Sequence, residues 1–240
     1  MNITEVTIIG EIVAKDYRAA KVFKIHNIDF CCNGNRTIGE ACSEKNLNVD
    51  ELISELKQEL EKSNETMTDF SAWPLDLLAD YIEKTHHRYV ESKITEIKSY
   101  LEKIVKVHDK RHPELFEIQS IFNHSAGELA MHMKKEELVL FPRIRKMVES
   151  KISNAEMPPA HFGTVQNPIA MMMSEHDNEG ENFRKISELS KHYIAPENAC
   201  NTYRVTFSLL KEFEEDLHKH IHLENNILFP KAIKLEKELT

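Results

Sequence analysis

Apolar residues recur every three to four positions over four long stretches in the C-terminal two thirds of the chain. This period places the apolar side chains along one face of a helix. The four stretches cover residues 74–109, 113–150, 167–193 and 197–237. Each stretch has a proline within one residue of its start, where a helix tolerates that residue best. The pattern predicts an antiparallel four-helix bundle over residues 74–240.

The first 62 residues show shorter helical patterns, at 5–14, 17–26, 38–46 and 49–62. Thr37 followed by Glu40 is a capping box, which marks the start of the third pattern. We therefore predict a small helical domain over residues 1–62 and a polar linker over 63–73. A unit of about 60 residues is near the lower limit for an independent core. It is expected to dock on the bundle, or on a second copy of the chain in a homodimer.

Composition agrees with an all-α fold and excludes several classes of protein. The 240 residues include only 6 glycines and 8 prolines, too few for a turn-rich β fold. A net charge of −9 argues against a nucleic-acid partner. No apolar run is long enough to span a membrane, and the N-terminus lacks the apolar region of a secretory signal. Four cysteines, two of them adjacent, do not form a secreted disulfide framework. We expect a cytoplasmic protein.

Two segments of the predicted bundle share the pattern H-x3-E-x3-L-F-P, the first starting at His132 and the second at His220. A helix places residues i and i+4 on one face, so each His and its Glu can bind one site together. Spacing alone is weak evidence in a chain rich in His and acids. The helical face is more selective: His132 and Glu136 continue an apolar stripe, and so do His220 and Glu224. The remaining candidates share faces with charged residues and are expected to be solvated: His87, His124, His218 and His222.

The other two predicted helices each carry one His on an apolar stripe, His86 and His176. The six groups that face the bundle core are His86, His132, Glu136, His176, His220 and Glu224. Burying carboxylates without a partner is very costly, so their convergence predicts a metal site. The alternative is a helical adaptor without metal, in which these residues are satisfied within the core.

Six protein ligands exceed what one zinc ion needs. Two metal ions, each bound by two His and sharing Glu136 and Glu224 as bridges, fit the count. Mixed nitrogen and oxygen ligation with open positions favours non-haem iron over manganese. The sequence therefore predicts a dinuclear iron site.

A second candidate feature is the vicinal pair Cys31-Cys32, which lies before a turn and just ahead of the capped helix. The amides at a helix N-terminus lower a thiol pKa and increase its reactivity. Redox, metal-binding and packing roles for the pair all stay open.

These residues together resemble a known family, the hemerythrin-like iron–sulfur cluster repair di-iron proteins of bacteria. The resemblance covers nearly the whole chain. It rests on Asp29-Phe30-Cys31-Cys32, on Thr85-His86, on the segment from His132 to Pro142, on Ser174-Glu175-His176-Asp177 and on the segment from His220 to Pro230. It implies the same six iron ligands around an oxo- or hydroxo-bridged pair of irons. Glu128 and Glu175 stand at acidic positions of the family, so they are expected beside the ligands or on the access path.

The resemblance implies a stress protein that helps repair iron–sulfur clusters damaged by nitric oxide or oxidants, by iron donation, by NO reduction, or by both. Its partners would be damaged iron–sulfur proteins and the diatomic ligands NO and O2. The alternative is a hemerythrin-type binding protein or sensor for O2 or NO without turnover. Oxygen carriers are richer in His, whereas this chain has a Glu in both motifs, which favours redox turnover or labile iron. Whether the centre acts as an enzyme is left open.

Overall fold

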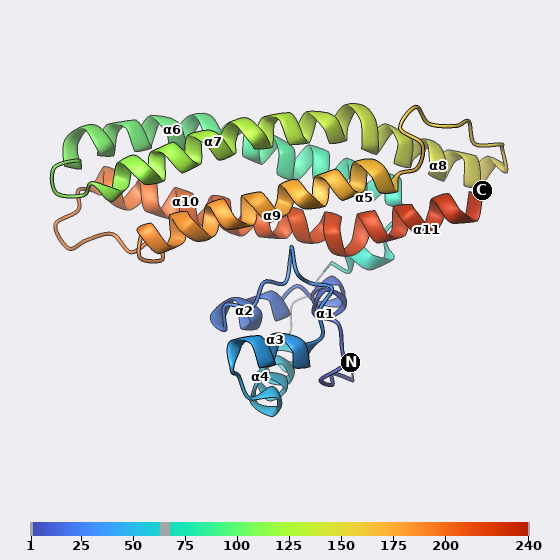
Figure 1. The fold of residues 1–240 in the computed structure, drawn as a ribbon, viewed down its shortest axis with the longest axis horizontal. Coiled ribbons are helices and arrows are strands. Elements are labelled where there is room, and N and C mark those ends of the chain that lie inside the picture. The colour runs from blue at the N-terminus through green and yellow to red at the C-terminus, as the bar shows by residue number, and fades with distance from the viewer. Residues whose placement is uncertain (1, 63–67, 240) are drawn as a thin grey trace.

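The protein is all-α, as predicted. The computed structural model describes residues 2–62 and 68–239, and these residues form helices and no β-strand beyond isolated bridge pairs. Four short helices come first: α1 (Ile9–Lys15), α2 (Ala19–Ile25), α3 (Ile38–Lys45) and α4 (Val49–Glu61). A 3-10 turn, η1, covers Phe70–Ala72. The rest of the chain forms a bundle of long helices (Figure 1).

Three of the four long rods of the bundle contain a short π-helical segment. The first rod consists of α5 (Leu75–Tyr81), η2 (Ile82–His87) and α6 (Arg88–His108). The second consists of α7 (Glu114–Lys135), η3 (Glu136–Leu140) and α8 (Phe141–Ser153). The third is α9 (Gln166–Leu189), and the fourth consists of α10 (Asn201–Leu223), η4 (Glu224–Leu228) and α11 (Phe229–Leu239). In the bundle, α6 packs against both α7 and α10, and α7 packs against α9.

Most of the predicted helix boundaries agree with the structure within a few residues, but the turn between the third and fourth rods differs. The helix predicted to reach residue 193 ends at Leu189. Positive φ angles occur at Lys191, His192 and Tyr193. A right-handed α-helix cannot continue through residues with positive φ. The last long helix begins at Asn201 rather than at 197. Pro196 therefore lies in the connection, outside the first helical turn.

Pro142 and Pro230 end the two H-x3-E-x3-L-F-P motifs, and a proline inside a helix is expected to kink or end it. In the structure each proline follows a π segment and occupies the first turn of the next helix, so the chain stays helical past it. The amide of Phe141 donates to the Glu136 carbonyl, and that of Phe229 to the Glu224 carbonyl, which closes the two wide turns. The motif H-x3-E-x3-L-F-P thus marks an α-to-π-to-α transition that occurs twice.

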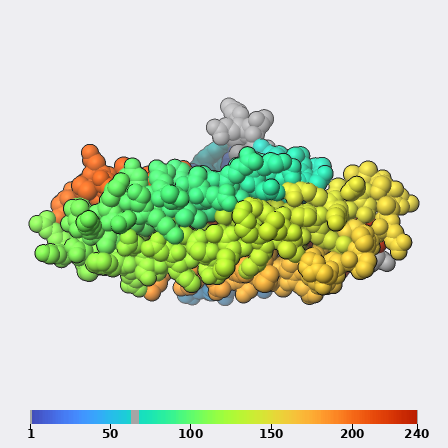
Figure 2. Space-filling view, turned by 90° about the horizontal axis from the view of Figure 1, so that it is seen from above, coloured from blue at the N-terminus to red at the C-terminus, as the bar shows by residue number. Residues whose placement is uncertain are grey.

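The N-terminal helices pack beneath the middle of the bundle, with the loop between α2 and α3 pointing into it (Figure 1). Seen from above, the helices from α6 to α8 form most of the visible face, and little of the N-terminal unit can be seen (Figure 2). Residues 63–67 of the predicted linker lie outside the described residues. The N-terminal core is continuous with one half of the bundle core, so a homodimer is not needed to cover it.

Two apolar clusters make up the core, one at each end of the bundle. One includes Val90, Leu129 and Phe183, and the other includes Ile82 and Leu140. The chain positions between the two clusters on all four rods carry the predicted His and Glu residues. A buried polar layer therefore divides the apolar core at one level of the bundle. No helix within residues 2–62 and 68–239 has the length and apolar character to cross a membrane.

Candidate metal centre

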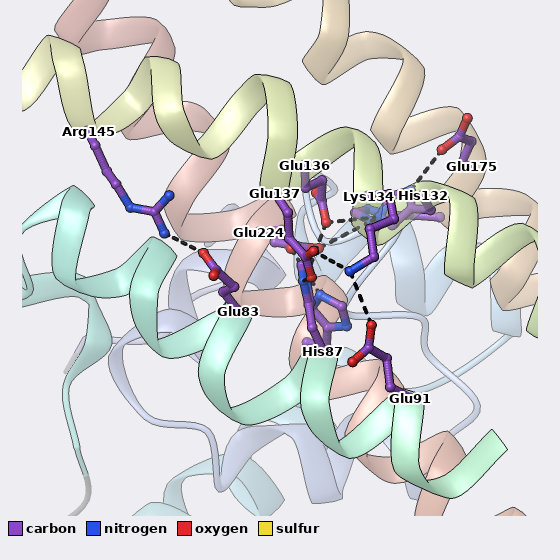
Figure 3. Close-up of polar contacts among 12 residues, drawn as sticks. Glu83, His87, Glu91, His132, Lys134, Glu136, Glu137, Arg145, Glu175 and Glu224 are labelled. Atoms are coloured by element: carbon purple, nitrogen blue, oxygen red, sulfur yellow. Dashed lines mark hydrogen bonds and ion pairs between the residues drawn. The ribbon is translucent and has the colours of Figure 1, made fainter. Parts of the chain in front are cut away.

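The polar layer contains two overlapping groups of metal-ligand side chains. One group is His87, Glu136, His220 and Glu224, and the other is His132, Glu136, His176 and Glu224. Within each group, one ligand atom from every residue lies within 4.8 Å of the others, and all these side chains are buried. Glu136 and Glu224 belong to both groups. Figure 3 shows Glu136 and Glu224 facing His87 from different helices.

The structure brings together five of the six predicted residues but replaces His86 with His87. His86 is buried, as expected from its stripe, but it belongs to neither group. The prediction that His87 faces solvent is wrong, since only 1% of its surface is exposed. The cause is η2, because a π turn holds one more residue than an α turn and rotates the following side chains. The step from Ile82 to the cluster is therefore five residues instead of four.

Two further histidines predicted to be solvated are also covered. His222 is buried and His218 is half-buried, because the N-terminal unit packs over this face of α10. The ring of Phe30 contacts both imidazoles. Burial lowers the pKa of His218 to about 4 and that of His222 to about 3. His124 is exposed, as predicted.

Hydrogen bonds to carboxylates orient two of the four clustered imidazoles. His87 Nδ1 lies 2.9 Å from Glu137 Oε1, and His132 Nδ1 lies 2.8 Å from Glu175 Oε2. An ionised carboxylate can only accept, so each Nδ1 carries the proton. In a neutral imidazole the Nε2 lone pair then faces the cluster. This arrangement is typical of metal-binding histidines in proteins.

The imidazoles of the second motif have different partners. His176 Nδ1 lies 2.8 Å from Asn225 Oδ1, a neutral acceptor. His220 Nε2 lies 3.0 Å from Glu224 Oε1, while its buried Nδ1 has no hydrogen-bond partner within the described residues. The ring of His86 stacks on His220 with centroids 5.6 Å apart, and its Nδ1 lies 2.9 Å from Asp216 Oδ1. His86 thus packs behind a member of the cluster.

The groups that meet at the centre are nearly all acceptors, which calls for a cation. His132 Nε2 and His176 Nε2 lie 3.0 Å apart, although the hydrogen bonds behind them give both atoms a lone pair. Both oxygens of Glu136 and one oxygen of Glu224 are buried without a hydrogen bond. Uncompensated buried carboxylates are costly. The imidazole nitrogens and carboxylate oxygens therefore fit a metal site.

The pKa shifts within the cluster reflect the same demand for positive charge. Burial opposes ionisation of Glu224, but His220 and His176 hold its pKa well below the ordinary value. Burial alone would lower the pKa of His132, but Glu136 and Glu175 raise it to about 10. The two carboxylates thus favour positive charge at this position. A metal ion would supply that charge without protonating a ligand.

A hollow of about 260 Å³ adjoins the second group of ligands. Its lining includes His132, His176, and the two acidic residues Glu128 and Glu175. Glu128 is exposed, whereas Glu175 is bound to His132 and forms an ion pair with Lys135. Glu175 therefore lies directly behind a clustered His, and Glu128 lines the hollow that borders the cluster.

Residues 27–34, here called the thiol loop, place the vicinal cysteines against α9. Cys32 Sγ lies 3.4 Å from the backbone carbonyl of His176 and 3.8 Å from Cys31 Sγ. The expected lowering of the thiol pKa is wrong for Cys31: its hydrogen bond to Cys32 and its burial raise the pKa. Asp29 accepts from the amides of Cys31 and Cys32, which explains its place in the loop.

The sequence analysis did not predict roles for Glu137 and Asn225, although the repeated motif contains a signal for both. Each directly follows the Glu of its motif, and each contacts a clustered His on another helix. His87 had no comparable signal, because η2 cannot be recognised from apolar periodicity.

The fold and the buried His/Glu layer define a hemerythrin-type metal-binding bundle. Residues 78–232 match the family model for the hemerythrin HHE cation binding domain. Residues 5–60 match a second family model, ScdA_N, described as a domain of unknown function (DUF542). The chain therefore belongs to the hemerythrin family.

Curated relatives narrow this assignment further. The iron-sulfur cluster repair protein YtfE of Pectobacterium carotovorum subsp. carotovorum (strain PC1) is 36% identical over 233 residues, covering 95% of this chain and 97% of the relative. YtfE of Yersinia pestis (strain Pestoides F) is 33% identical over 219 residues, covering 91% and 93%. The chain belongs to this family of iron–sulfur cluster repair proteins, which confirms the resemblance seen in the sequence.

Proposed function

We propose that this protein is a di-iron protein that helps repair iron–sulfur clusters damaged by nitric oxide or oxidants. The observation that carries the proposal is the convergence of four imidazoles and two buried carboxylates in two groups that share Glu136 and Glu224. The ligands proposed for one ion are His87 and His220, and those for the other are His132 and His176. Glu136 and Glu224, which belong to both groups, would bridge the two ions.

Iron bound in this centre would supply one-electron redox chemistry and would bind small diatomic molecules. The chain provides the ligand positions, and Glu137 and Glu175 hold two imidazoles in the tautomer that binds metal. The hollow lined by Glu128 and Glu175 gives cations and small molecules a path to the centre. Both roles proposed for the family, iron donation and NO reduction, would use these same features.

The domain organisation is part of the proposal. Residues 1–62 would form the thiol-bearing unit, residues 63–73 the linker, and residues 74–240 the di-iron bundle. Damaged iron–sulfur proteins, NO and O2 would be its partners in the cytoplasm. The thiol loop lies beside α9, so a cluster brought to the cysteines would be near the metal centre.

Iron content and Mössbauer spectra of protein purified without chelators test the proposal. The wild type should contain about two irons per chain in similar environments. Glu136→Ala should lose at least one iron, because it removes a bridge. Glu83→Ala is a suitable control, since Glu83 pairs with Arg145 on the nearby surface and is not part of the cluster. Near-zero iron with intact helicity would support the adaptor without metal.

Anaerobic reaction of the reduced protein with NO separates turnover from binding. With an excess of an external reductant present, consumption of NO beyond the amount of iron, with release of N2O, supports a reductase role. A stable and reversible O2 adduct in the visible spectrum supports the hemerythrin-type carrier instead. Transfer of iron to an apo iron–sulfur protein, without NO consumption, supports iron donation alone.

A further inference from the structure

Among the four clustered imidazoles, only that of His176 has a side-chain amide as the hydrogen-bond partner of its Nδ1 atom. We propose that Asn225 is a positioning residue that fixes the tautomer of His176 and couples it to the thiol loop. Through this coupling, covalent modification of the Cys32 thiol changes how tightly the centre holds the ion nearest His176. The inference rests on the proposed metal centre.

The orientation of the Asn225 amide follows from its two partners. The backbone carbonyl of Cys31 can only accept, so it faces the amide nitrogen, with 3.2 Å from Asn225 Nδ2 to the carbonyl oxygen. Asn225 Oδ1 must then face His176 Nδ1, 2.8 Å away. Because an amide oxygen can only accept, His176 carries its proton on Nδ1 and presents its Nε2 lone pair to the centre.

The internal repeat shows what is unusual about this residue. Glu137 and Asn225 occupy the same position, directly after Glu136 and Glu224. A carboxylate behind an imidazole raises its basicity and strengthens its bond to metal, whereas an amide does so less. An amide also has N–H donors, and Asn225 uses one of them to bind the thiol loop. Asn225 therefore strengthens its imidazole as a ligand less than Glu137 does, but it also connects that imidazole to the thiol loop.

The thiol loop is held close enough to transmit a change. Cys32 Sγ lies against the α9 backbone, 3.4 Å from the His176 carbonyl oxygen. A Cβ added at Gly180, one turn later, would be 3.3 Å from this sulfur, so the glycine allows the close approach. A cavity of about 480 Å³ borders both cysteines and admits reagents. A group attached to Cys32 would displace the loop, and with it the Cys31 carbonyl and Asn225.

Iron release from the full-length protein tests the role of Asn225. Protein loaded anaerobically with Fe(II) is mixed with an excess of a coloured Fe(II) chelator, and the rate of capture is followed. Asn225→Ala should accelerate loss of the weaker-held ion about 10- to 100-fold. Asn225→Asp should slow it below the wild-type rate, since it restores the carboxylate present in the first motif. A merely structural role would move both variants in the same direction.

Asn226→Ala is the matched control. Asn226 binds the same loop through the Phe30 carbonyl but does not contact His176, so its loss should change the release rates far less than the loss of Asn225. Wild-type release rates in a folded Asn225→Ala protein that binds two irons would overturn the proposal.

Alkylation tests the coupling to the cysteines. In a Cys200→Ser background, which removes the exposed thiol, iodoacetamide modification of Cys32 should accelerate release of one ion. The same treatment should have no effect in Asn225→Asp, which cannot donate to the Cys31 carbonyl. An equal effect in both proteins would contradict the coupling.

Nitrogen-15 NMR of the metal-free protein distinguishes failure of this inference from failure of the proposed function. The His176 ring should show a protonated Nδ1 in the wild type, and this preference should be lost in Asn225→Ala. Loss of the preference in a protein that binds no iron would leave the positioning role standing and reject the di-iron function. An unchanged tautomer in Asn225→Ala would reject the positioning role whatever the iron content.

Discussion

The charge state of individual side chains explains why a polar layer is stable inside this bundle. Each clustered imidazole except His220 has a partner behind it that holds Nδ1 as the donor. The Nε2 atoms and the carboxylates then meet without a proton between most of them. Such a cluster is costly when empty and favourable when it holds cations. The tautomers in the layer are therefore set by residues outside the cluster: Glu137, Glu175 and Asn225.

At the residue scale, substitutions of the two adjacent histidines give the sharpest prediction. His87→Ala should reduce the iron content to about one per chain, because it removes one of two imidazoles from its ion. His86→Ala should keep both irons, with a modest change in the spectrum of the ion near His220. Metal analysis and Mössbauer spectra provide the measurement. Loss of iron in His86→Ala alone would mean that the α-helical register holds at this turn.

At the scale of secondary structure, three wide turns place the ligands. η2, η3 and η4 all lie within the polar layer, and each begins or ends at a residue of the cluster. A π turn interrupts the regular α-helical hydrogen bonds, and such turns are rare but frequent at functional sites. Two of the three turns are followed by a proline, which cannot donate to the carbonyl four residues earlier. From the sequence, both prolines are expected to kink or end their helices, whereas the structure places a π segment before each of them and continues the helix.

The capping box predicted at Thr37 is present in the structure and allows a local test. Thr37 accepts from the Glu40 amide, and Glu40 in turn accepts from the Thr37 amide. Thr37→Ala should lower the free energy of unfolding by about 1 kcal/mol and speed hydrogen exchange in α3. Thr37→Ser keeps the side-chain acceptor and should stay near the wild type. Equal losses in both variants would indicate that the methyl group, not the cap, stabilises α3.

At the scale of the whole molecule, the N-terminal unit covers the bundle next to the metal centre. Its core joins that of the bundle, and Asn226 contacts both the thiol loop and His222. Gly10 and Gly34 permit this close packing, since a Cβ at either would lie within 3.0 Å of other atoms. The position of the cysteines relative to the clustered His and Glu residues depends on this interface.

Gly34→Ala tests the interface. The added Cβ would be 2.4 Å from the Phe30 carbonyl oxygen, so the backbone of the thiol loop must move. We expect a loss of about 1–3 kcal/mol in the free energy of unfolding and faster alkylation of Cys32. Gly127→Ala is the control: nothing lies within 4 Å of its Cβ, and a helix-interior Ala should stabilise by about 0.5–1 kcal/mol. Unchanged alkylation in Gly34→Ala would show that the loop tolerates the displacement.

The sequence by itself determined the helical class, the bundle and five of the six clustered residues, because these depend on local periodicity and on a repeated motif. Only the tertiary structure decided between His86 and His87, because a π turn changes the helical face without changing the apolar pattern. It also decided which solvated-looking faces are covered, since burial of His218 and His222 depends on a unit distant in sequence. The link from Cys31 through Asn225 to His176 joins three segments of the chain, so no local pattern could reveal it.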